Sequence, residues 1–225
     1  MLINIEGTDS SGKQTQTRML YEHLAQKGLR VKQISFPNYN SESSALVKMY
    51  LNGDFGKNPE DVNAKAASIF FACDRFASFR THWKKYYESG YIIVSDRYTS
   101  SNIINQACKI DDIKEKMEFV SWLEELEYET FEIPKPDKTI FLNMPYEKSQ
   151  ELMKNRRNKI SGEKQKDIHE SNSEYLKVTY ERSMEICEKL SWHKVDCVDE
   201  YGDLKTLKDI NTEIIEIVEG MLNEK

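Results

Sequence analysis

The sequence predicts a three-layer α/β fold, in which a five-stranded parallel sheet is flanked by helices on both faces. Two observations support this. Short apolar runs suited to buried strands alternate with longer helical stretches along the 225 residues. Strands that alternate with helices form parallel sheets, because right-handed crossovers return the chain to the same edge. No segment rich in Pro, Gly or Ser divides the chain, so we expect one domain over residues 1–225.

The first half of the chain contains three of the expected strands. They are residues 2–5, a strand that begins near Val31, and residues 91–95. Between the first two we expect a helix over residues 15–26, which Gly28 ends. A long helical segment is expected over residues 59–90, with Asn58 as its cap.

The second half continues the alternation of strands and helices. The expected strands are residues 138–142 and 195–198, and the expected helices are residues 145–158, 173–190 and 204–221. These elements complete the five strands.

The composition excludes several classes of function. The 38 acidic and 32 basic residues give a formal net charge of −6, which argues against a nucleic-acid partner. No apolar run approaches the roughly 18 residues of a membrane span, and the first residues lack the pattern of a signal peptide. We therefore expect a cytoplasmic protein without a membrane partner.

The cysteines and histidines predict no metal centre. The four cysteines lie far apart without metal-ligand spacing, so we expect reduced thiols that pack in the apolar interior. The four histidines are equally scattered, and we expect solvated or capping roles for them.

Residues 148–166 form a basic segment in this acidic chain. The segment holds seven Lys or Arg residues and two Glu residues, a local charge of +5. This density fits either a solvated helix face or a mobile flap that closes over polyphosphate. The flap, or lid, would span approximately residues 154–170.

A phosphate-binding motif follows the first expected strand. Residues 7–13 read Gly-Thr-Asp-Ser-Ser-Gly-Lys, which matches GxxxxGK between a strand and a helix. In such a loop, backbone N–H groups and the helix N-terminus face the phosphates, and the lysine reaches the outer ones. The motif predicts the P-loop NTPase version of the three-layer fold, with Gly7, Gly12 and Lys13 at the phosphates.

The loop departs from the usual pattern at the metal position. Gln14 stands where Ser or Thr usually offers a hydroxyl to Mg²⁺, and Thr15 comes one residue later. The metal would be held by the Gln14 amide oxygen, through a water, or mainly by carboxylates elsewhere. The sequence leaves these alternatives open.

Charged residues are expected beside the loop. Asp96 and Arg97 follow the third strand, which places them at the edge where open α/β sheets bind ligands. Asp96 can hold a metal or its water and Arg97 can clamp a second phosphate, although a structural ion pair is the alternative. Asp9, inside the loop, indicates either a hydroxyl-bearing second substrate or an Asx turn.

Five short motifs, in the same order, resemble the thymidylate kinase family of P-loop nucleoside monophosphate kinases. They are residues 5–16, Phe36-Pro37, residues 71–75 with Phe71 and Arg75, Asp96-Arg97-Tyr98, and the Ile-Pro-Lys-Pro-Asp of residues 133–137. The similarity extends over nearly the whole chain. It implies transfer of the γ-phosphoryl group of ATP to dTMP with Mg²⁺ as cofactor, and a homodimer.

The resemblance also implies a role for each matching residue. The ATP phosphates would be bound by Gly7, Ser10, Ser11, Gly12, Lys13, Gln14 and Thr15. The dTMP site would comprise Asp9 at the 3′-hydroxyl, Phe71 stacked on thymine, Arg75 at its carbonyl edge, Arg97 at the phosphate, Asn102 at the ring, and Phe36 and Tyr98 beside the deoxyribose. Asp96 would support Mg²⁺, with Gln14 as the second candidate.

Catalysis would depend on Lys13, Asp96 and Arg97 together with a lid arginine. The phosphate loop carries no arginine, so the helper role falls to Arg156 or Arg157.

Two alternatives compete with this interpretation. One is a kinase of the same fold that acts on another deoxynucleotide or on a nucleoside. The other is a P-loop switch that binds nucleotide without multiple turnover.

For Phe71, which follows Ile69 and Phe70, the alternative to base stacking is core packing.

Overall fold

The computed structural model describes residues 1–153, 167–169 and 171–223. Its five strands form one parallel sheet, as predicted, in the order β2-β3-β1-β4-β5. The strands are β1 (Leu2–Gly7), β2 (Val31–Ser35), β3 (Ile92–Asp96), β4 (Lys138–Asn143) and β5 (His193–Asp196). The chain moves from β1 to one edge and later to the other, so the loop after β1 lies at the switch point where such sheets bind ligands.

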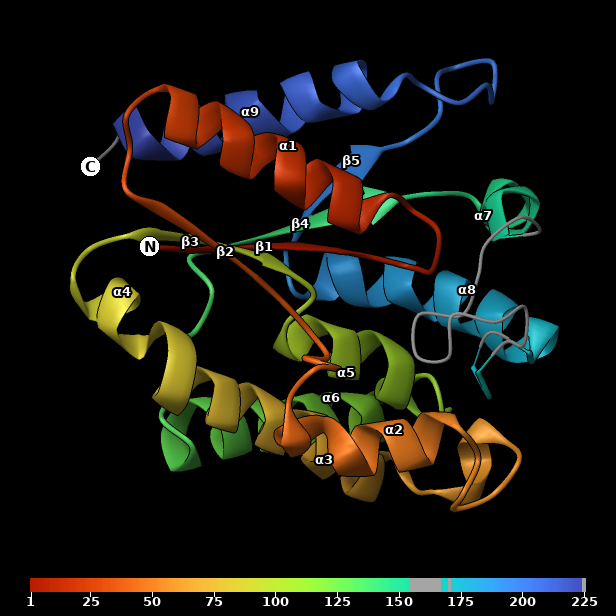
Figure 1. Cartoon of the computed structure of the whole chain (residues 1–225). Helices are drawn as coiled ribbons and strands as arrows, with labels where there is room; N and C mark the ends of the chain where they lie inside the picture. Colours follow the sequence, from red (N-terminus) through yellow and green to blue (C-terminus); the bar gives the residue numbers. More distant parts are fainter. Residues whose placement is uncertain (154–166, 170, 224–225) are drawn as a thin grey trace.

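Helices cover both faces of the sheet (Figure 1). On one face lie α1 (Lys13–Gln26) and α9 (Leu207–Asn223). On the side of the other face lie α3 (Ala64–Ser78), α4 (Lys84–Glu88), α5 (Thr99–Ala107), α6 (Ile113–Glu124) and α8 (Ser173–Lys189), and α2 (Ala45–Leu51) contacts α3. The short helix α7 (Tyr146–Met153) follows β4. The three predicted layers are therefore present.

The core is divided by the sheet. Alternate residues of a strand face opposite sides, and both sides of β1 are buried. Ile3 and Ile5 pack with Leu20 of α1, whereas Leu2 packs with Trp83 on the opposite side. The β1 strand is thus fixed on both faces, which holds the loop that follows it.

The register brings three strand ends together. Ile5 of β1 lies opposite Asp96 of β3, and Ser35 of β2 lies opposite the same residue. Side chains from the ends of β1, β2 and β3 therefore meet at one edge.

The expected long helix over residues 59–90 was wrong in its start and continuity. Asn58 caps a short 3₁₀ turn, η2 (Pro59–Asp61), through a capping box with Asp61. Helix α3 begins later, where the Asn63 side chain accepts a hydrogen bond from the Ala66 N–H at 2.9 Å. A π-helical turn, η3 (Phe79–Trp83), separates α3 from α4.

Other boundaries also differ from those expected. Helices α2, α5 and α6 were not expected, and a second π-helical turn, η4 (Glu125–Thr130), follows α6. Strand β3 begins and ends one residue later than expected, strand β5 begins and ends two residues earlier, and α9 begins three residues later. The Gly28 stop is confirmed, since its φ of 77° and its N–H bond to Ala25 O end α1.

Three of the four cysteines lie in the interior and one lies on the surface. Cys108, Cys187 and Cys197 are buried free thiols as predicted, but Cys73 is exposed on α3, so its assignment to the interior was wrong. Among the described residues, no helix has both the length and the apolarity needed to span a membrane.

Candidate active site

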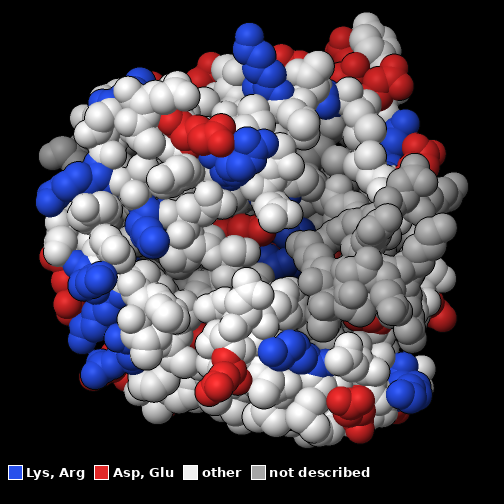
Figure 2. All heavy atoms as spheres, viewed as in Figure 1, with Lys and Arg blue, Asp and Glu red and all other residues white. Residues whose placement is uncertain are grey.

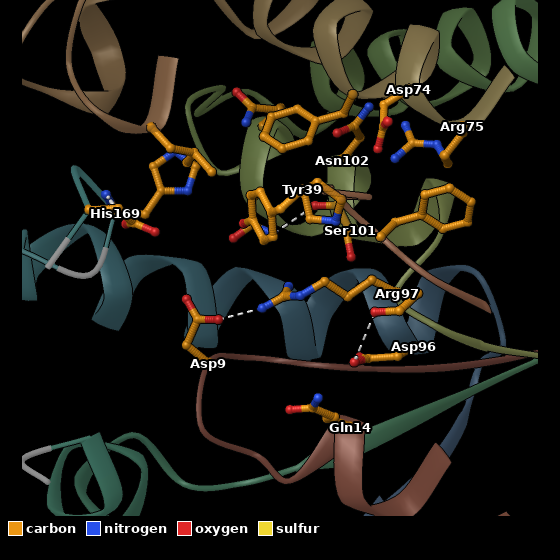
Figure 3. A pocket seen from close by; sticks show the side chains of 18 residues that line it. Asp9, Gln14, Tyr39, Asp74, Arg75, Asp96, Arg97, Ser101, Asn102 and His169 are labelled. Atoms are coloured by element: carbon orange, nitrogen blue, oxygen red, sulfur yellow. Dashed lines mark hydrogen bonds and ion pairs between the residues drawn. The ribbon is translucent and has the colours of Figure 1, made fainter. Parts of the chain in front are cut away.

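A cavity of about 310 Å³ opens at the carboxyl edge of the sheet. Figure 2 shows this face hollowed near its centre, where acidic and basic side chains adjoin. The cavity brings together the predicted residues Asp9, Gln14, Phe36, Phe71, Arg75, Asp96, Arg97 and Asn102. They come from the ends of β1, β2 and β3 and from α1, α3 and α5, and they surround one space (Figure 3).

The phosphate loop runs from β1 into α1. A Cβ atom at Gly7 would lie 2.6 Å from Ser11 Oγ and 2.8 Å from Leu142 O, so only glycine fits there. Gly12 has a φ of 88°, a left-handed conformation that favours glycine, and α1 begins at the next residue. The remaining residues predicted for ATP lie in this loop or in the first turn of α1, namely Ser10, Ser11, Lys13, Gln14 and Thr15.

Lys13 is buried against its own loop. Its Nζ donates to Gly7 O at 2.8 Å and to Thr8 O at 2.6 Å. Burial, with a contribution from the Arg97 charge, lowers the pKa of Lys13 from 10.5 to about 7. The nearby carboxylates, Asp9 first among them, oppose this shift. A third, longer contact joins Nζ to Ser11 Oγ at 3.5 Å.

Arg97 joins the loop to the cavity. Its backbone has a φ of 67°, a strained conformation of the kind found at functional sites, and its N–H donates to Ile5 O at 3.1 Å. The guanidinium is paired with Asp9 and lies 4.0 Å from a Glu6 oxygen. Burial opposes its charge, but Asp9, Glu6 and Asp96 together raise the pKa of Arg97. Arg97 is therefore positively charged, and it lines the cavity.

Asp96 carries an uncommitted carboxylate oxygen. The residue is only 3% exposed, and its Oδ2 accepts a 3.4 Å hydrogen bond from Ser35 Oγ. Its buried Oδ1 has no hydrogen-bond partner within the described part of the chain. A buried, unpaired carboxylate oxygen suits a cation, and Gln14 lines the same cavity. No group of three or more His, Cys, Asp or Glu side chains that could hold a metal occurs in the described ranges.

The wall opposite the phosphate loop is formed by α3 and α5. Phe71 lines the cavity with its ring edge-on to Tyr50, at a centroid distance of 6.2 Å. Arg75 is almost completely buried and bonded to Glu127. Asn102 donates from Nδ2 to Ser68 O at 3.0 Å, which uses one of its two amide N–H donors. The Phe71 ring thus packs against Tyr50 and is also exposed to the cavity, so core packing and base stacking do not exclude each other.

Tyr98, predicted with Phe36 beside the deoxyribose, lies behind Phe36 in the structure. Its side chain is fully buried and does not line the cavity. The hydroxyl donates to Pro134 O at 2.9 Å, and the ring lies 5.9 Å from that of Phe36. Tyr98 supports Phe36 from behind, because the aromatic cluster under β2 and β3 encloses it.

Several cavity residues were not predicted. Gln106 is fully buried on α5, and among the residues described its amide makes no well-formed hydrogen bond but lies close enough to the Tyr50 hydroxyl to oppose the burial-driven rise of the pKa of Tyr50. It follows Asn102 by four residues, a spacing that places both on one helix face and was available in the sequence. Asp74 accepts from Asn38 N at 2.7 Å and from Ser43 Oγ at 2.6 Å, which holds the chain after β2.

His169 also lines the cavity, against the expected solvated or capping role. Its Nε2 lies 2.9 Å from the Tyr50 hydroxyl, which also accepts from Lys109 Nζ at 3.1 Å. Burial, with the Lys109 charge, lowers the pKa of His169 to about 3, so the ring is neutral. No pattern around this lone histidine pointed to the cavity.

Most of the predicted lid lies outside the described residues. Arg156 and Arg157 are among the residues not described, and of the approximate span 154–170 only 167–169 is described. Asp167 and His169 from this short stretch line the cavity.

The fold and the phosphate loop together define a P-loop nucleotide-binding protein. The phosphate loop enters α1 on one side of the cavity, and an aspartate-arginine pair at the end of β3 faces it. The sequence profile described as Thymidylate kinase matches residues 5–207, and the chain belongs to the thymidylate kinase family.

Individual relatives agree with this assignment. The putative thymidylate kinase 251L of Invertebrate iridescent virus 6 is 34% identical over 109 residues, 48% of each chain. The probable thymidylate kinase of Thermococcus onnurineus is 26% identical over 226 residues, 99% of this chain and 98% of the relative.

Solved structures show the same architecture. Thymidylate kinase from Candida albicans superimposes with a TM-score of 0.73 and 26% identity, covering 100% of this chain and 93% of the other. Thymidylate kinase from Ehrlichia chaffeensis gives a TM-score of 0.66 at 18% identity, covering 97% and 98%, and supports the fold alone.

Proposed function

We propose that the chain transfers the γ-phosphoryl group of ATP to dTMP, giving ADP and dTDP. The observation that carries the proposal is the cavity, in a chain of the thymidylate kinase family. The cavity places the positive charge of Arg97 between a phosphate loop and a wall that holds Phe71 and Arg75. An acceptor with a phosphate at one end and a base at the other fits this order of groups.

The donor is assigned to the phosphate loop. The N–H groups of residues 10–14 and the N-terminus of α1 would bind the ATP phosphates. A polyphosphate beside Lys13 favours its charged form, so the ammonium would neutralise charge on the transferring phosphoryl. This assignment is supported by the glycine conformations at Gly7 and Gly12 and by the place of Lys13.

The acceptor is assigned to the opposite side. Arg97 would bind the dTMP phosphate and Asp9 would meet the sugar hydroxyl. Phe71 would stack on the base, whose edge would meet Arg75 and Asn102. An oxygen of the dTMP phosphate forms the new bond to the γ-phosphorus as the bond to ADP breaks. No general base is assigned, because a phosphate monoester is largely ionised near neutral pH.

Mg²⁺ is the proposed cofactor. The unpaired Oδ1 of buried Asp96 and the Gln14 amide would hold it, together with phosphate oxygens. When bound, it would offset negative charge on the phosphates during transfer. The carboxylate donor fits a hard cation, and a single protein carboxylate with phosphates is a usual magnesium environment.

Two substitutions test the catalytic assignments. Lys13→Ala and Arg97→Ala should each lower kcat/KM for dTMP by about 10² to 10³-fold, because each removes a positive charge that offsets the negative charge of the reacting phosphates. The control is Arg18→Ala, since Arg18 is an exposed residue on the same helix as Lys13. ADP release would be measured on variants whose circular dichroism matches the wild type. Near-normal turnover in either catalytic variant would remove that role.

We also propose a homodimer, as the resemblance implies. Ile69, Cys73 and Phe76 form an exposed stripe at helical spacing on α3, and a second copy would cover it. Light scattering coupled to size exclusion should give twice the 26.4 kDa chain mass for the wild type and the single mass for Phe76→Glu. A monomeric wild type would contradict the proposal. The cytoplasmic location and the lid role of Arg156 or Arg157 stay predictions.

A further inference from the structure

Arg75 forms a buried ion pair that the predicted site did not include. Its Nε donates to Glu127 Oε2 at 2.6 Å and its NH2 donates to Glu127 Oε1 at 2.5 Å. Arg75 is 2% exposed and Glu127 is fully buried. The two residues come from α3 and from the π-helical turn η4, which are 52 positions apart. Two parallel hydrogen bonds between rigid planar groups fix the guanidinium plane.

Neighbouring groups fix the pair further. Thr99 Oγ1 donates to Glu127 Oε2 at 3.0 Å. Arg75 NH1 donates to Tyr98 O at 3.5 Å. A guanidinium has five N–H donors, of which these contacts use three. Because Arg75 also lines the cavity, the two donors that no described residue accepts, one on each terminal nitrogen, can reach a ligand there.

The net charge of the Arg75–Glu127 pair determines which ligand groups the remaining Arg75 N–H donors bind. Burial by itself would lower the pKa of Arg75, but the Glu127 charge and hydrogen bonds raise it, so the guanidinium stays protonated. The carboxylate offsets the positive charge, so this wall offers hydrogen-bond donors with little net charge. Such donors favour a neutral carbonyl oxygen over a phosphate, and an amino group would place donor against donor.

Glu127 stands where packing alone favours an apolar side chain. The inward face of α6 contains Val120 and Leu123, and position 127 continues it at helical spacing. A buried ion pair seldom adds stability over apolar residues of similar volume. Leu126, next to it, is only partly buried. Two apolar residues in place of the pair would serve the core as well, so packing alone does not explain why the pair is present.

We propose that Glu127 is a positioning residue for base specificity. It orients Arg75 so that the free N–H donors select an acceptor monophosphate whose base presents a carbonyl at this edge, and reject one that presents an amino group. This inference rests on the proposed function, in which Arg75 meets the base.

The test compares acceptors that differ at this edge. Glu127→Gln keeps the size of the side chain but removes its charge and turns one acceptor into a donor facing Arg75. We expect the KM for dTMP to rise about tenfold or more and the dTMP-to-dCMP ratio of kcat/KM to fall by a similar factor. The KM for ATP should stay within about twofold of wild type, because within the described residues the hydrogen bonds of Glu127 go to Arg75 and Thr99 and not to the phosphate loop.

A matched control separates positioning from stability. Lys116 of α6 forms another ion pair, with Glu185 at 2.9 Å, and neither residue lines the cavity. Glu185→Gln should therefore leave the dTMP-to-dCMP ratio unchanged, even where it lowers the melting temperature. A folded Glu127→Gln enzyme with the wild-type ratio would overturn the proposal.

A second variant covers the case in which Glu127→Gln does not fold. Thr99→Val removes one hydrogen bond from the carboxylate but keeps the ion pair and the side-chain volume. We expect the same ratio to fall by about threefold or more, and an unchanged ratio would overturn the proposal. A wild-type chain that fails to phosphorylate dTMP would instead refute the proposed function. The two failures are thus distinguishable.

Discussion

Binding of ATP should take up a proton on Lys13. Burial holds the pKa of Lys13 at about 7 in the structure, so at about pH 8 the amine is roughly 10% protonated. Phosphates beside Nζ would return the pKa to its ordinary value near 10.5 or above, where the ammonium is nearly fully protonated. The difference is an uptake of about 0.9 proton per ATP at about pH 8, and about 0.1 at about pH 6.

Isothermal titration calorimetry measures this uptake directly. The observed binding enthalpy would be plotted against the ionisation enthalpy of buffers such as phosphate and Tris, and the slope gives the protons exchanged. ATP itself contributes little at about pH 8, because its terminal phosphate is already ionised. Lys13→Met removes the titrating group and is the control. A slope near zero for the wild type at about pH 8, or an equal slope for the control, would refute the reasoning.

Three further predictions follow from the site. Gly7→Ala should abolish detectable ATP binding by calorimetry, because the new Cβ would meet Ser11 Oγ and Leu142 O at under 3 Å; binding within threefold of wild type would contradict the tight fit. Gln106→Leu should raise the melting temperature by removing a buried amide that makes no well-formed hydrogen bond within the described residues, and should also raise the KM for dTMP at least about threefold; a lower melting temperature would show that the approach of the amide to Tyr50 stabilises the fold. The pKa of Lys13 is lower in the folded chain than in the unfolded chain, so the unfolded chain binds more protons between about pH 7 and 10.5. The free energy of unfolding would be measured in urea for the wild type and for Lys13→Met. The wild-type value minus the Lys13→Met value should increase from about pH 7 to about pH 10.5. A difference that does not change with pH would contradict the conclusion that burial lowers the pKa of Lys13.

Local sequence patterns predicted the sheet and the phosphate loop. The strands β1, β3 and β4 are short apolar runs next to a glycine or a proline, and the GxxxxGK spacing specifies backbone conformations at Gly7 and Gly12. Helix boundaries were less accurate. Asn58 and Asn63 are both capping residues with an acidic or small residue three positions later, and the sequence alone did not show that the chain stops and restarts between them.

The parts of the site that depend on packing between distant segments could not be predicted. Motifs placed Asp9 and Arg97 separately, but their pairing across 88 positions results from the sheet order. Glu127 became visible only once α6 and η4 were packed against α3, since a glutamate on a helix is most often solvated. His169 was missed for the same reason, because its partner Tyr50 lies 119 positions away.

The central claim is that this cavity selects dTMP as the phosphoryl acceptor. The most direct test is ADP release from ATP and Mg²⁺ with dTMP, dUMP, dCMP, dGMP, UMP or thymidine as acceptor, against a control without acceptor. We predict that dTMP gives the highest kcat/KM and that thymidine, which lacks the phosphate for Arg97, gives a rate close to the control. A higher kcat/KM for another acceptor, or ATP binding with no dependence on acceptor, would contradict the account.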